Sequence, residues 1–313
     1  MESRPIQETA VIGAGLLGHG IALEYAVAGY QVRIADRSAS ALDLAIDRVQ
    51  RSLNMLVSLG RVNETQVNSV MGRISPVTKI EDAAISADLI IEAVFENLEL
   101  KRQIFERLDE SAPKHAILLS NTSTFVPSAL IENDLRAQQV AVAHYFNPPH
   151  LLPVVEVVRG PFTSNQTIER VVTFLRSVGK RPAIVNREIP GFIGNRLQAA
   201  LFREALALVH AGIATPEDID TVVKYGFGRR LAAAGPFEVW EQASWDLISS
   251  ILETLYPEID VSQRVPSILT DLVKQGHLGT KTGKGFYDWT PGAADALHRH
   301  MGKMLALLAQ QDG

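Results

Sequence analysis

Short apolar runs alternate with longer stretches of helical periodicity over the first 189 residues. A short apolar run is typical of a buried strand, and apolar residues recurring every three or four positions are typical of an amphipathic helix. The expected strands cover residues 8–12, 31–35, 89–94, 116–119, 139–143, 152–158 and 182–185, and the clearest helices cover 38–59, 98–108 and 165–177. Strands that alternate with helices predict an α/β domain with a doubly wound sheet.

The pattern changes at residue 190, beyond which the sequence has helical periodicity without strand-like runs. Helices are expected to begin in residues 190–196, 215–218 and 235–238, the last one running through Ile251, with two more at 265–274 and 293–310. Thr215, Pro216 and the two acids after them stand in the order preferred at a helix start. We therefore expect an α/β domain over residues 1–189 and an all-α C-terminal domain over residues 190–313.

The first expected strand ends in a glycine-rich turn, Gly13-Ala14-Gly15-Leu16-Leu17-Gly18, which opens a helix. In a dinucleotide-binding turn the first glycine permits the bend, the second lets a pyrophosphate approach, and the third lets helix and strand pack closely. Asp36 ends the second strand, where a carboxylate accepts from the adenosine ribose and repels a 2′-phosphate. The pattern predicts a Rossmann-type domain that binds NAD, with Arg37 as the residue that could instead accommodate NADP.

Two polar side chains interrupt neighbouring apolar runs farther along the chain. His144 ends the run 139–143, and Glu156 lies in the middle of the run 152–158. If the two strands are neighbours, a carboxylate on one ring nitrogen fixes the tautomer of the imidazole and makes it an oriented general base. The alternative is a histidine at a strand end and an unrelated carboxylate on a half-exposed strand.

Polar residues also follow two other expected strands. Residues 95–97 come after the strand 89–94, and residues 120–124 come after the strand 116–119. Doubly wound sheets bind ligands outside the carboxyl ends of their strands, so both segments are expected over the same crevice. The alternative for residues 120–124 is a turn rich in Ser and Asn that only caps residues 127–130.

Composition narrows the class of protein. The 313 residues are 46% hydrophobic, enough for a sizeable core, and the net charge of -5 gives no basic field for nucleic acid. The chain has no cysteine, which excludes thiol catalysis, and its eight histidines show no metal-ligand spacing, so no metal site is expected. With neither a signal sequence nor a membrane-spanning run, we expect a cytoplasmic protein without a membrane partner.

Eight motifs together resemble one family, the L-3-hydroxyacyl-CoA dehydrogenases and their relatives that act on free hydroxy acids, such as L-gulonate 3-dehydrogenase and L-carnitine dehydrogenase. The likeness runs from about Glu8 to Trp289. The motifs, in family order, are GAGLLG, EAVFENLELK, SNTST, HYFNPP, VVEVV, PGFIGNR, GPFE and KTGKGFY. The resemblance implies a homodimer formed through the helical domain and a place in fatty acid metabolism.

The resemblance also implies residue roles. His144 is expected as the catalytic base, Glu156 as its orienting carboxylate, and Ser123 and Asn195 as the groups that hold the reacting oxygen of the substrate. The residues expected to bind the cofactor are Gly13, Gly15, Leu16, Leu17, Gly18, Asp36, Glu96, Lys101, Asn121, Ser123, Asn147 and Lys281. The residues expected to bind the substrate are Ser52, Ser123, Asn195 and Arg230.

The sequence leaves the substrate open between two branches of the family. Ser52 matches a position that contacts CoA, but Leu59 stands where typical acyl-CoA members carry a lysine, which Arg51 or Arg61 would have to replace. Arg230, in turn, would suit the carboxylate of a free acid unless it is only a surface residue. We expect NAD-dependent oxidation of an L-3-hydroxyacyl-CoA, with a free 3-hydroxy acid as the alternative.

A third alternative is a dinucleotide-binding protein without catalytic activity. It would require the loss of a catalytic group, and all four expected groups are present in the sequence.

Overall fold

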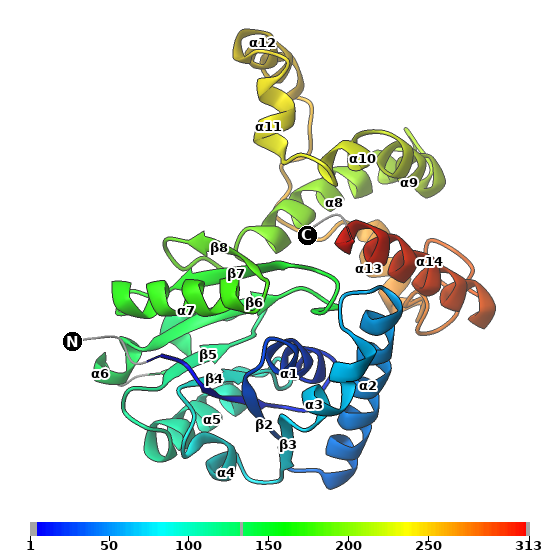
Figure 1. Ribbon diagram of the computed structural model, residues 1–313. Coiled ribbons are helices and arrows are strands. Elements are labelled where there is room, and N and C mark those ends of the chain that lie inside the picture. The colour runs from blue at the N-terminus through cyan, green and yellow to red at the C-terminus, as the bar shows by residue number, and fades with distance from the viewer. Residues whose placement is uncertain (1–4, 132–133, 311–313) are drawn as a thin grey trace. The chain divides into compact units, whose positions relative to one another are not determined.

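The computed structural model describes residues 5–131 and 134–310 (Figure 1). Its strands form one eight-stranded sheet in the order β3-β2-β1-β4-β5-β6-β7-β8. The strands are β1 (Glu8–Ile12), β2 (Gln31–Ala35), β3 (Ile74–Val77), β4 (Leu89–Glu92), β5 (Ile117–Ser120), β6 (Val140–Tyr145), β7 (Val154–Arg159) and β8 (Arg181–Val185). All neighbours pair in parallel except β6 and β7, which are antiparallel. The doubly wound α/β prediction is confirmed.

Helices cover both faces of this sheet. They are α1 (Gly18–Val27), α2 (Ala39–Ser58), η1 (Glu64–Gln66), α3 (Val67–Met71), α4 (Ile80–Ala84), α5 (Leu98–Ser111), η2 (Pro127–Ala129), α6 (Asp134–Ala137) and α7 (Asn165–Ser177). One core cluster packs α1, α2 and α7 against the sheet, and a second packs α4 and α5 against the opposite face. In β4, Leu89 and Ile91 enter the first cluster and Ile90 the second. Burial of both faces therefore explains the continuous apolar runs.

The rest of the chain is helical. It contains α8 (Gly194–His210), α9 (Pro216–Tyr225), α10 (Phe227–Leu231), α11 (Pro236–Glu241), α12 (Trp245–Leu255), α13 (Ser267–Lys274) and α14 (Pro291–Ala309). The all-α C-terminal part is thus as predicted. The single helix predicted from residue 235 through Ile251 is instead two helices, α11 and α12. Ser244 separates them with a φ of +69°, a conformation that a helix cannot continue.

Strand β3 and helix α4 are absent from the sequence prediction. The apolar run of β3 is short and contains Pro76, which cannot donate to a sheet. Proline is tolerated here because β3 is the edge strand, paired only with β2 in the sheet order.

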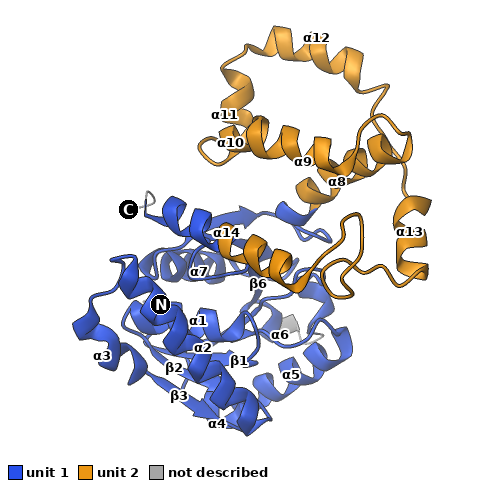
Figure 2. Cartoon of the chain, turned by 90° about the vertical axis from the view of Figure 1, so that its right-hand side faces the viewer, with its two compact units in different colours: residues 1–195, 301–313 blue, residues 196–300 orange. Residues whose placement is uncertain are grey.

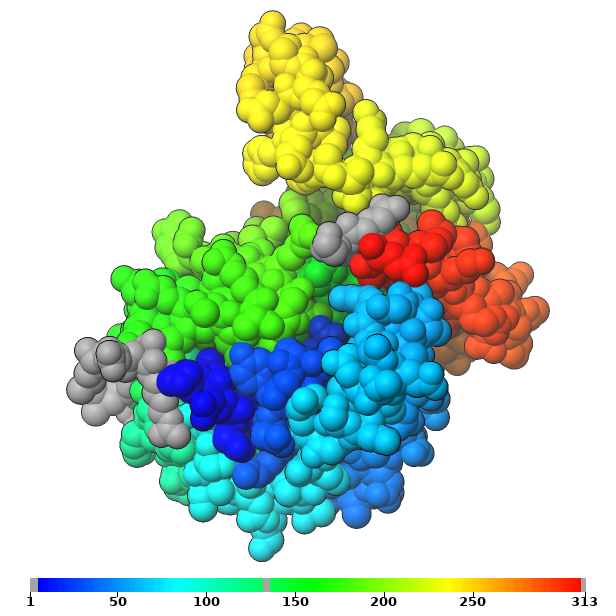
Figure 3. All heavy atoms as spheres, viewed as in Figure 1, coloured from blue at the N-terminus to red at the C-terminus, as the bar shows by residue number. Residues whose placement is uncertain are grey.

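The described chain divides into two compact units, coloured in Figure 2. The first holds residues 1–195 and 301–313, and the second holds residues 196–300. Residue 309 at the end of α14 and residues 59–61 after α2 line one cavity of the first unit. Figure 3 shows the end of α14 (red) beside the light-blue segment that follows α2. The domain boundary at residue 189 stays a prediction. None of the helices described is long and apolar enough to span a membrane.

Candidate active site

The glycine-rich turn after β1 has the geometry that a dinucleotide requires. Gly13 has a φ of +108°, and its amide donates to the carbonyl of Ala35 at 2.7 Å. A Cβ on Gly18 would lie 1.8 Å from the carbonyl oxygen of Gly13, so only glycine lets α1 start this close to the strand. A Cβ on Gly15 would meet nothing within 4 Å. The open space at Gly15 fits the pyrophosphate of NAD beside the N-terminus of α1.

Asp36 lies directly after β2, and its carboxylate also shapes the glycine-rich turn. One oxygen accepts from the amide of Ala14 at 3.1 Å, and the other accepts from the amide of Ser38 at 3.1 Å. The carboxylate is half-buried, so it keeps an accessible side for the ribose hydroxyls of NAD. Leu16 is exposed and Leu17 is half-buried in the same turn.

His144 and Glu156 lie directly opposite each other in the antiparallel ladder of β6 and β7. His144 Nδ1 donates to Glu156 Oε2 at 2.7 Å, and both side chains are buried. The other carboxylate oxygen, Oε1, accepts from the amides of Ile193 and Gly194, both at 2.8 Å. Glu156 therefore joins the histidine to the start of α8. The strand pairing that the sequence left conditional is present.

The surroundings of Glu156 keep it ionised. Burial alone would raise the pKa of its carboxyl, but the hydrogen bonds from His144, Gly194 and Ile193 together lower that pKa below its ordinary value. Since an ionised carboxylate can only accept, the proton of neutral His144 must reside on Nδ1. Nε2 is then the free acceptor of the ring.

Ser123 lies at this free acceptor. Its hydroxyl donates to His144 Nε2 at 3.1 Å. Asn195, in the first turn of α8, donates from Nδ2 to the carbonyl oxygen of Ser123 at 3.2 Å. The four expected catalytic side chains are thus adjacent, and residues 120–124 do more than cap the turn after them.

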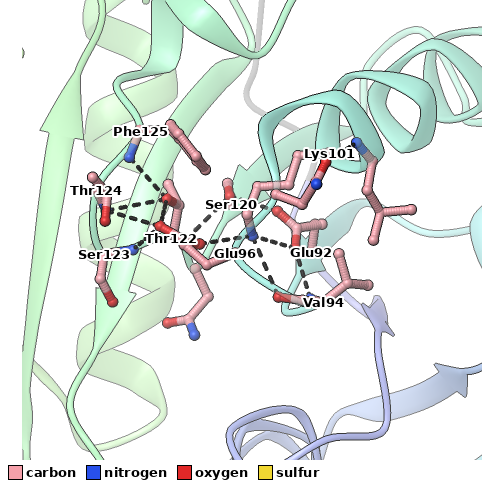
Figure 4. A network of polar contacts seen from close by, with 12 residues as sticks. Glu92, Val94, Glu96, Lys101, Ser120, Thr122, Ser123, Thr124 and Phe125 are labelled. Atoms are coloured by element: carbon pink, nitrogen blue, oxygen red, sulfur yellow. Dashed lines mark hydrogen bonds and ion pairs between the residues drawn. The ribbon is translucent and has the colours of Figure 1, made fainter. Parts of the chain in front are cut away.

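Glu96, which accepts from the amide of Ser123, forms an ion pair with Lys101 (Figure 4). Lys101 Nζ lies 3.3 Å from Glu96 Oε2, and the lysine is 1% exposed. Asn121 is also buried, and its side-chain oxygen accepts from the amide of Tyr145 at 2.8 Å, which joins β5 to β6. Asn147 is exposed after β6. The expected contacts of Glu96, Lys101, Asn121 and Asn147 with the cofactor stay predictions.

The described contacts do not test the other three expected residues, Ser52, Arg230 and Lys281. Ser52 is buried in α2. Arg230 lies in α10 and Lys281 lies in the loop after α13, both exposed and both in the second unit. Their roles in binding substrate and cofactor stay predictions.

Sequence reasoning missed Glu92, the last residue of β4. It is fully buried, and its carboxylate accepts from Ser120 Oγ at 2.6 Å and from the amide of Val94 at 2.7 Å. The sequence did contain an indication of this role, because a carboxylate within a continuous apolar run is buried and must then have hydrogen-bond partners.

Comparisons with known proteins agree with this geometry. Residues 8–189 match the model "3-hydroxyacyl-CoA dehydrogenase, NAD binding domain", and residues 191–289 match "3-hydroxyacyl-CoA dehydrogenase, C-terminal domain". A probable 3-hydroxybutyryl-CoA dehydrogenase of Bacillus subtilis is 37% identical over 285 residues, which cover 91% of this chain and 98% of the relative.

A different named substrate appears among the relatives. The 5-formyl-3-hydroxy-2-methylpyridine 4-carboxylate 5-dehydrogenase of Mesorhizobium japonicum is 31% identical over 300 residues, covering 96% of each chain. A crystal structure of a 5-dehydrogenase for the same compound, described as an NAD+ dependent dismutase, superposes with a TM-score of 0.91 at 30% identity and covers 98% of each chain.

The Rossmann-type sheet, the glycine-rich turn and these relatives define the protein as an NAD-dependent dehydrogenase, which is an oxidoreductase. More specifically, the chain belongs to the 3-hydroxyacyl-CoA dehydrogenase family.

Proposed function

We propose that the protein oxidises the 3-hydroxyl of an L-3-hydroxyacyl-CoA to the 3-ketone with NAD, and catalyses the reverse reduction. The observation that carries the chemistry is the contact of His144 with Glu156 on one ring nitrogen and with Ser123 on the other. That arrangement is a general base held in one tautomer beside a hydroxyl that can hold a substrate oxygen.

In this mechanism His144 Nε2 takes the proton of the substrate hydroxyl. Glu156 stabilises the imidazolium that forms, because its carboxylate already accepts from Nδ1. Bound NAD would supply the acceptor for a hydride from the carbon that carries this hydroxyl, so that loss of the proton and the hydride would convert the alcohol to a carbonyl. Ser123 and Asn195 donate hydrogen bonds to the oxygen as negative charge develops there.

A His144→Ala variant tests the role of the histidine. It should bind NADH as the wild type does and lose turnover by a factor of about 10² to 10⁴, the usual contribution of a general base. Fluorescence titration of NADH and steady-state rates measure the two quantities separately. Turnover that survives the change would overturn the mechanism, and an absence of turnover in the wild type on every substrate offered would favour the alternative without catalysis.

The second candidate substrate is a free hydroxy acid, and three observations around α2 favour it. Ser52 is 8% exposed, so its hydroxyl is poorly accessible to a nucleotide. Leu59 offers no charge to a phosphate, and Arg61 already donates from Nη1 to the carbonyl of His150 at 3.2 Å. The Mesorhizobium relative, whose named substrate is a pyridine carboxylate, supports the same reading.

The two candidates are separated by rates on a matched panel. NADH oxidation with acetoacetyl-CoA is compared with NAD reduction by L-gulonate, L-carnitine and 3-hydroxybutyrate, and with turnover of 5-formyl-3-hydroxy-2-methylpyridine 4-carboxylate. Saturation with the CoA ester alone supports the first candidate. Saturation with one of the free acids and not with the CoA ester replaces it by the second.

We also infer that the protein is a homodimer formed through its second unit. Among the described residues of that unit, only Leu206 and Ile248 are buried apolar side chains. An apolar groove of about 570 Å³ lies open between α8 and α9, lined by residues such as Leu201, Phe202 and Val223. A unit that leaves this much apolar surface in water is typical of half of an interface. A monomer by light scattering at micromolar concentration would contradict the dimer.

A cytoplasmic location and a role in fatty acid metabolism stay predictions.

A further inference from the structure

A buried group of charges lies behind Ser123, and the mechanism above does not use it (Figure 4). Its anchor is Glu92, which is 0% exposed at the end of β4. The carboxylate accepts from Ser120 Oγ, from the amide of Val94 and from Lys101 Nζ, at 2.6, 2.7 and 2.8 Å. Three donors from three segments leave this carboxylate one position, because a buried charge is stable only when its partners surround it.

Lys101 joins this anchor to a second carboxylate. Its ammonium lies 2.8 Å from Glu92 Oε1 and 3.3 Å from Glu96 Oε2. Lys101 stands in the first turn of α5, where Asn97 caps the helix by accepting from the amide of Leu100 at 2.9 Å. The start of the helix therefore holds the lysine in place, and its positive charge between the two carboxylates offsets their mutual repulsion.

Glu96 links Lys101 to the turn that contains Ser123. Its Oε1 accepts from Thr122 Oγ1 at 2.5 Å and from the amides of Ser123 and Thr124 at 3.1 and 3.0 Å. The side chain of Glu96 is 39% exposed, so protein packing alone does not fix it. The hydrogen bonds to Oε1 hold one oxygen, and the ammonium of Lys101 restrains the other.

The last contact of the series reaches the reacting groups. The backbone of Ser123 is held by Glu96 on its amide and by Asn195 on its carbonyl, and the hydroxyl of the same residue donates to His144 Nε2 at 3.1 Å. A displacement of the turn by about 1 Å would break this hydrogen bond, and displacements of that size are known to reduce rates about a hundredfold. The placement of Ser123 thus depends on the charge behind it.

We propose that Lys101 is a positioning residue, which is anchored by buried Glu92 and holds Glu96 so that the Ser123 hydroxyl lies against His144. This role rests on the proposed function for its effect on rate, but it does not require Lys101 to touch the cofactor. It differs from a purely structural ion pair, whose loss would lower stability without acting through Ser123.

A double-mutant cycle with Ser123 separates these roles. Lys101→Met removes the charge at similar length, and it should lower kcat tenfold to a hundredfold in the wild type but less than twofold in a Ser123→Ala background. An equal loss of kcat in both backgrounds would overturn the proposal. A weaker Kd for NADH that accounts for the lost rate would assign Lys101 to the cofactor instead.

Lys180→Met is the matched control. Lys180 is also a buried lysine of the first unit, paired with Glu24 and donating to the carbonyl of Pro149 at 2.7 Å. This variant should lose thermal stability as Lys101→Met does and keep kcat within twofold. If it loses kcat to the same extent, the effect of Lys101 is one of stability and the proposal fails.

Two further measurements keep the test decisive. If Lys101→Met does not fold, Glu96→Ala removes the half-exposed carboxylate and should show the same dependence on Ser123. A crystal structure of either variant reads the position of Ser123 without any substrate, and there the distance from Oγ to His144 Nε2 should exceed hydrogen-bonding range. An unchanged distance would overturn the positioning role even if the substrate of the enzyme differs from the one proposed.

Discussion

The histidine of the site depends on a carboxylate that has two tasks. Glu156 accepts from His144 with one oxygen and from the amides of Ile193 and Gly194 with the other. The sequence predicted the first task from a histidine at a strand end and a lone acid in the next apolar run. The second task was not predictable, because the amides that complete it come from a turn 37 and 38 residues away.

Glu156→Gln should separate these tasks. The amide oxygen of the glutamine can still accept from Ile193 and Gly194, which leaves its NH2 group facing His144 Nδ1. Nδ1 must then accept, so Nε2 carries the proton and cannot act as a base. We expect kcat to fall about 10² to 10⁴-fold with the Kd for NADH unchanged. A kcat within threefold of the wild type, measured at saturating substrate, would contradict this assignment.

Ionised Glu96 should stabilise the folded protein, and this stabilisation should be lost at acidic pH. Burial alone would raise the pKa of its carboxyl, but the hydrogen bond from Thr122 and the charge of Lys101 bring that pKa below its ordinary value of 4.5. Because the pKa is lower in the folded state, the stabilisation is complete above the unfolded pKa and is lost as the pH falls through the folded one.

In Glu96→Gln this contribution is absent. The free energy of unfolding in urea should therefore fall less steeply for the variant than for the wild type as the pH decreases below about 4.5. Other carboxyls, Glu156 included, titrate in both proteins and cancel in the comparison. Parallel curves for the two proteins would show that the charge of Glu96 is not stabilised by folding.

At the scale of elements, the glycine-rich turn between β1 and α1 shows how one motif combines two requirements. Gly18 is needed for packing, since its Cβ would lie 1.8 Å from the carbonyl oxygen of Gly13. Gly15 is needed for the ligand, since its Cβ would enter open space. The sequence predicted both roles from the spacing, and the distances distinguish them.

Gly15→Ala and Gly18→Ala should therefore fail in different ways. The free energy of unfolding of Gly15→Ala should lie within about 0.5 kcal/mol of the wild-type value. The variant should bind NAD at least about tenfold more weakly. Gly18→Ala should lose about 2 kcal/mol or more of stability, because the strand and helix must separate to admit the methyl group. Thermal unfolding and NADH titration measure the two effects. Equal loss of stability in both variants would contradict the division.

The antiparallel pairing of β6 with β7 is the element that assembles the site. It sets His144 opposite Glu156, and β5 beside β6 brings Ser123 to the same end of the sheet. The apolar runs predicted both strands, but a run of apolar residues has no preferred direction. Direction and register were decided by which neighbours each strand found.

At the scale of the whole molecule, the second unit leaves its apolar faces exposed. On α12, Leu247, Ile251 and Leu255 recur every four residues on one face and are all exposed. The opposite face carries polar residues such as Ser249. A helix of this kind needs a partner surface for its apolar face.

Leu247→Asp should therefore weaken the homodimer, while Ser249→Asp introduces the same charge on the polar face of the same helix and should leave it intact. Light scattering across micromolar concentrations would show a monomer for the first variant and a dimer for the second. The wild type and both variants having the same molecular mass would exclude this face of α12 from the interface.

The sequence by itself determined the local structure of this protein. Helical and strand periodicities, the glycine-rich turn and a polar residue at the end of an apolar run are short-range patterns that the backbone geometry of a few residues enforces. They were sufficient to predict the doubly wound sheet, the NAD-binding turn and the pairing of His144 with Glu156. Family motifs then supplied Ser123 and Asn195, because the local pattern at either position does not by itself indicate a role.

Only the tertiary structure decided how charges inside the sheet are compensated. Glu92 and Lys101 are nine residues apart, but Ser120, which donates to Glu92, belongs to the next strand. Thr122 and Ser123, which donate to Glu96, belong to the turn after that strand. Hydrogen bonds between such distant segments depend on chain topology, which no local pattern records. The position of Ser123 against His144, and with it the geometry of the site, follows from those long-range contacts.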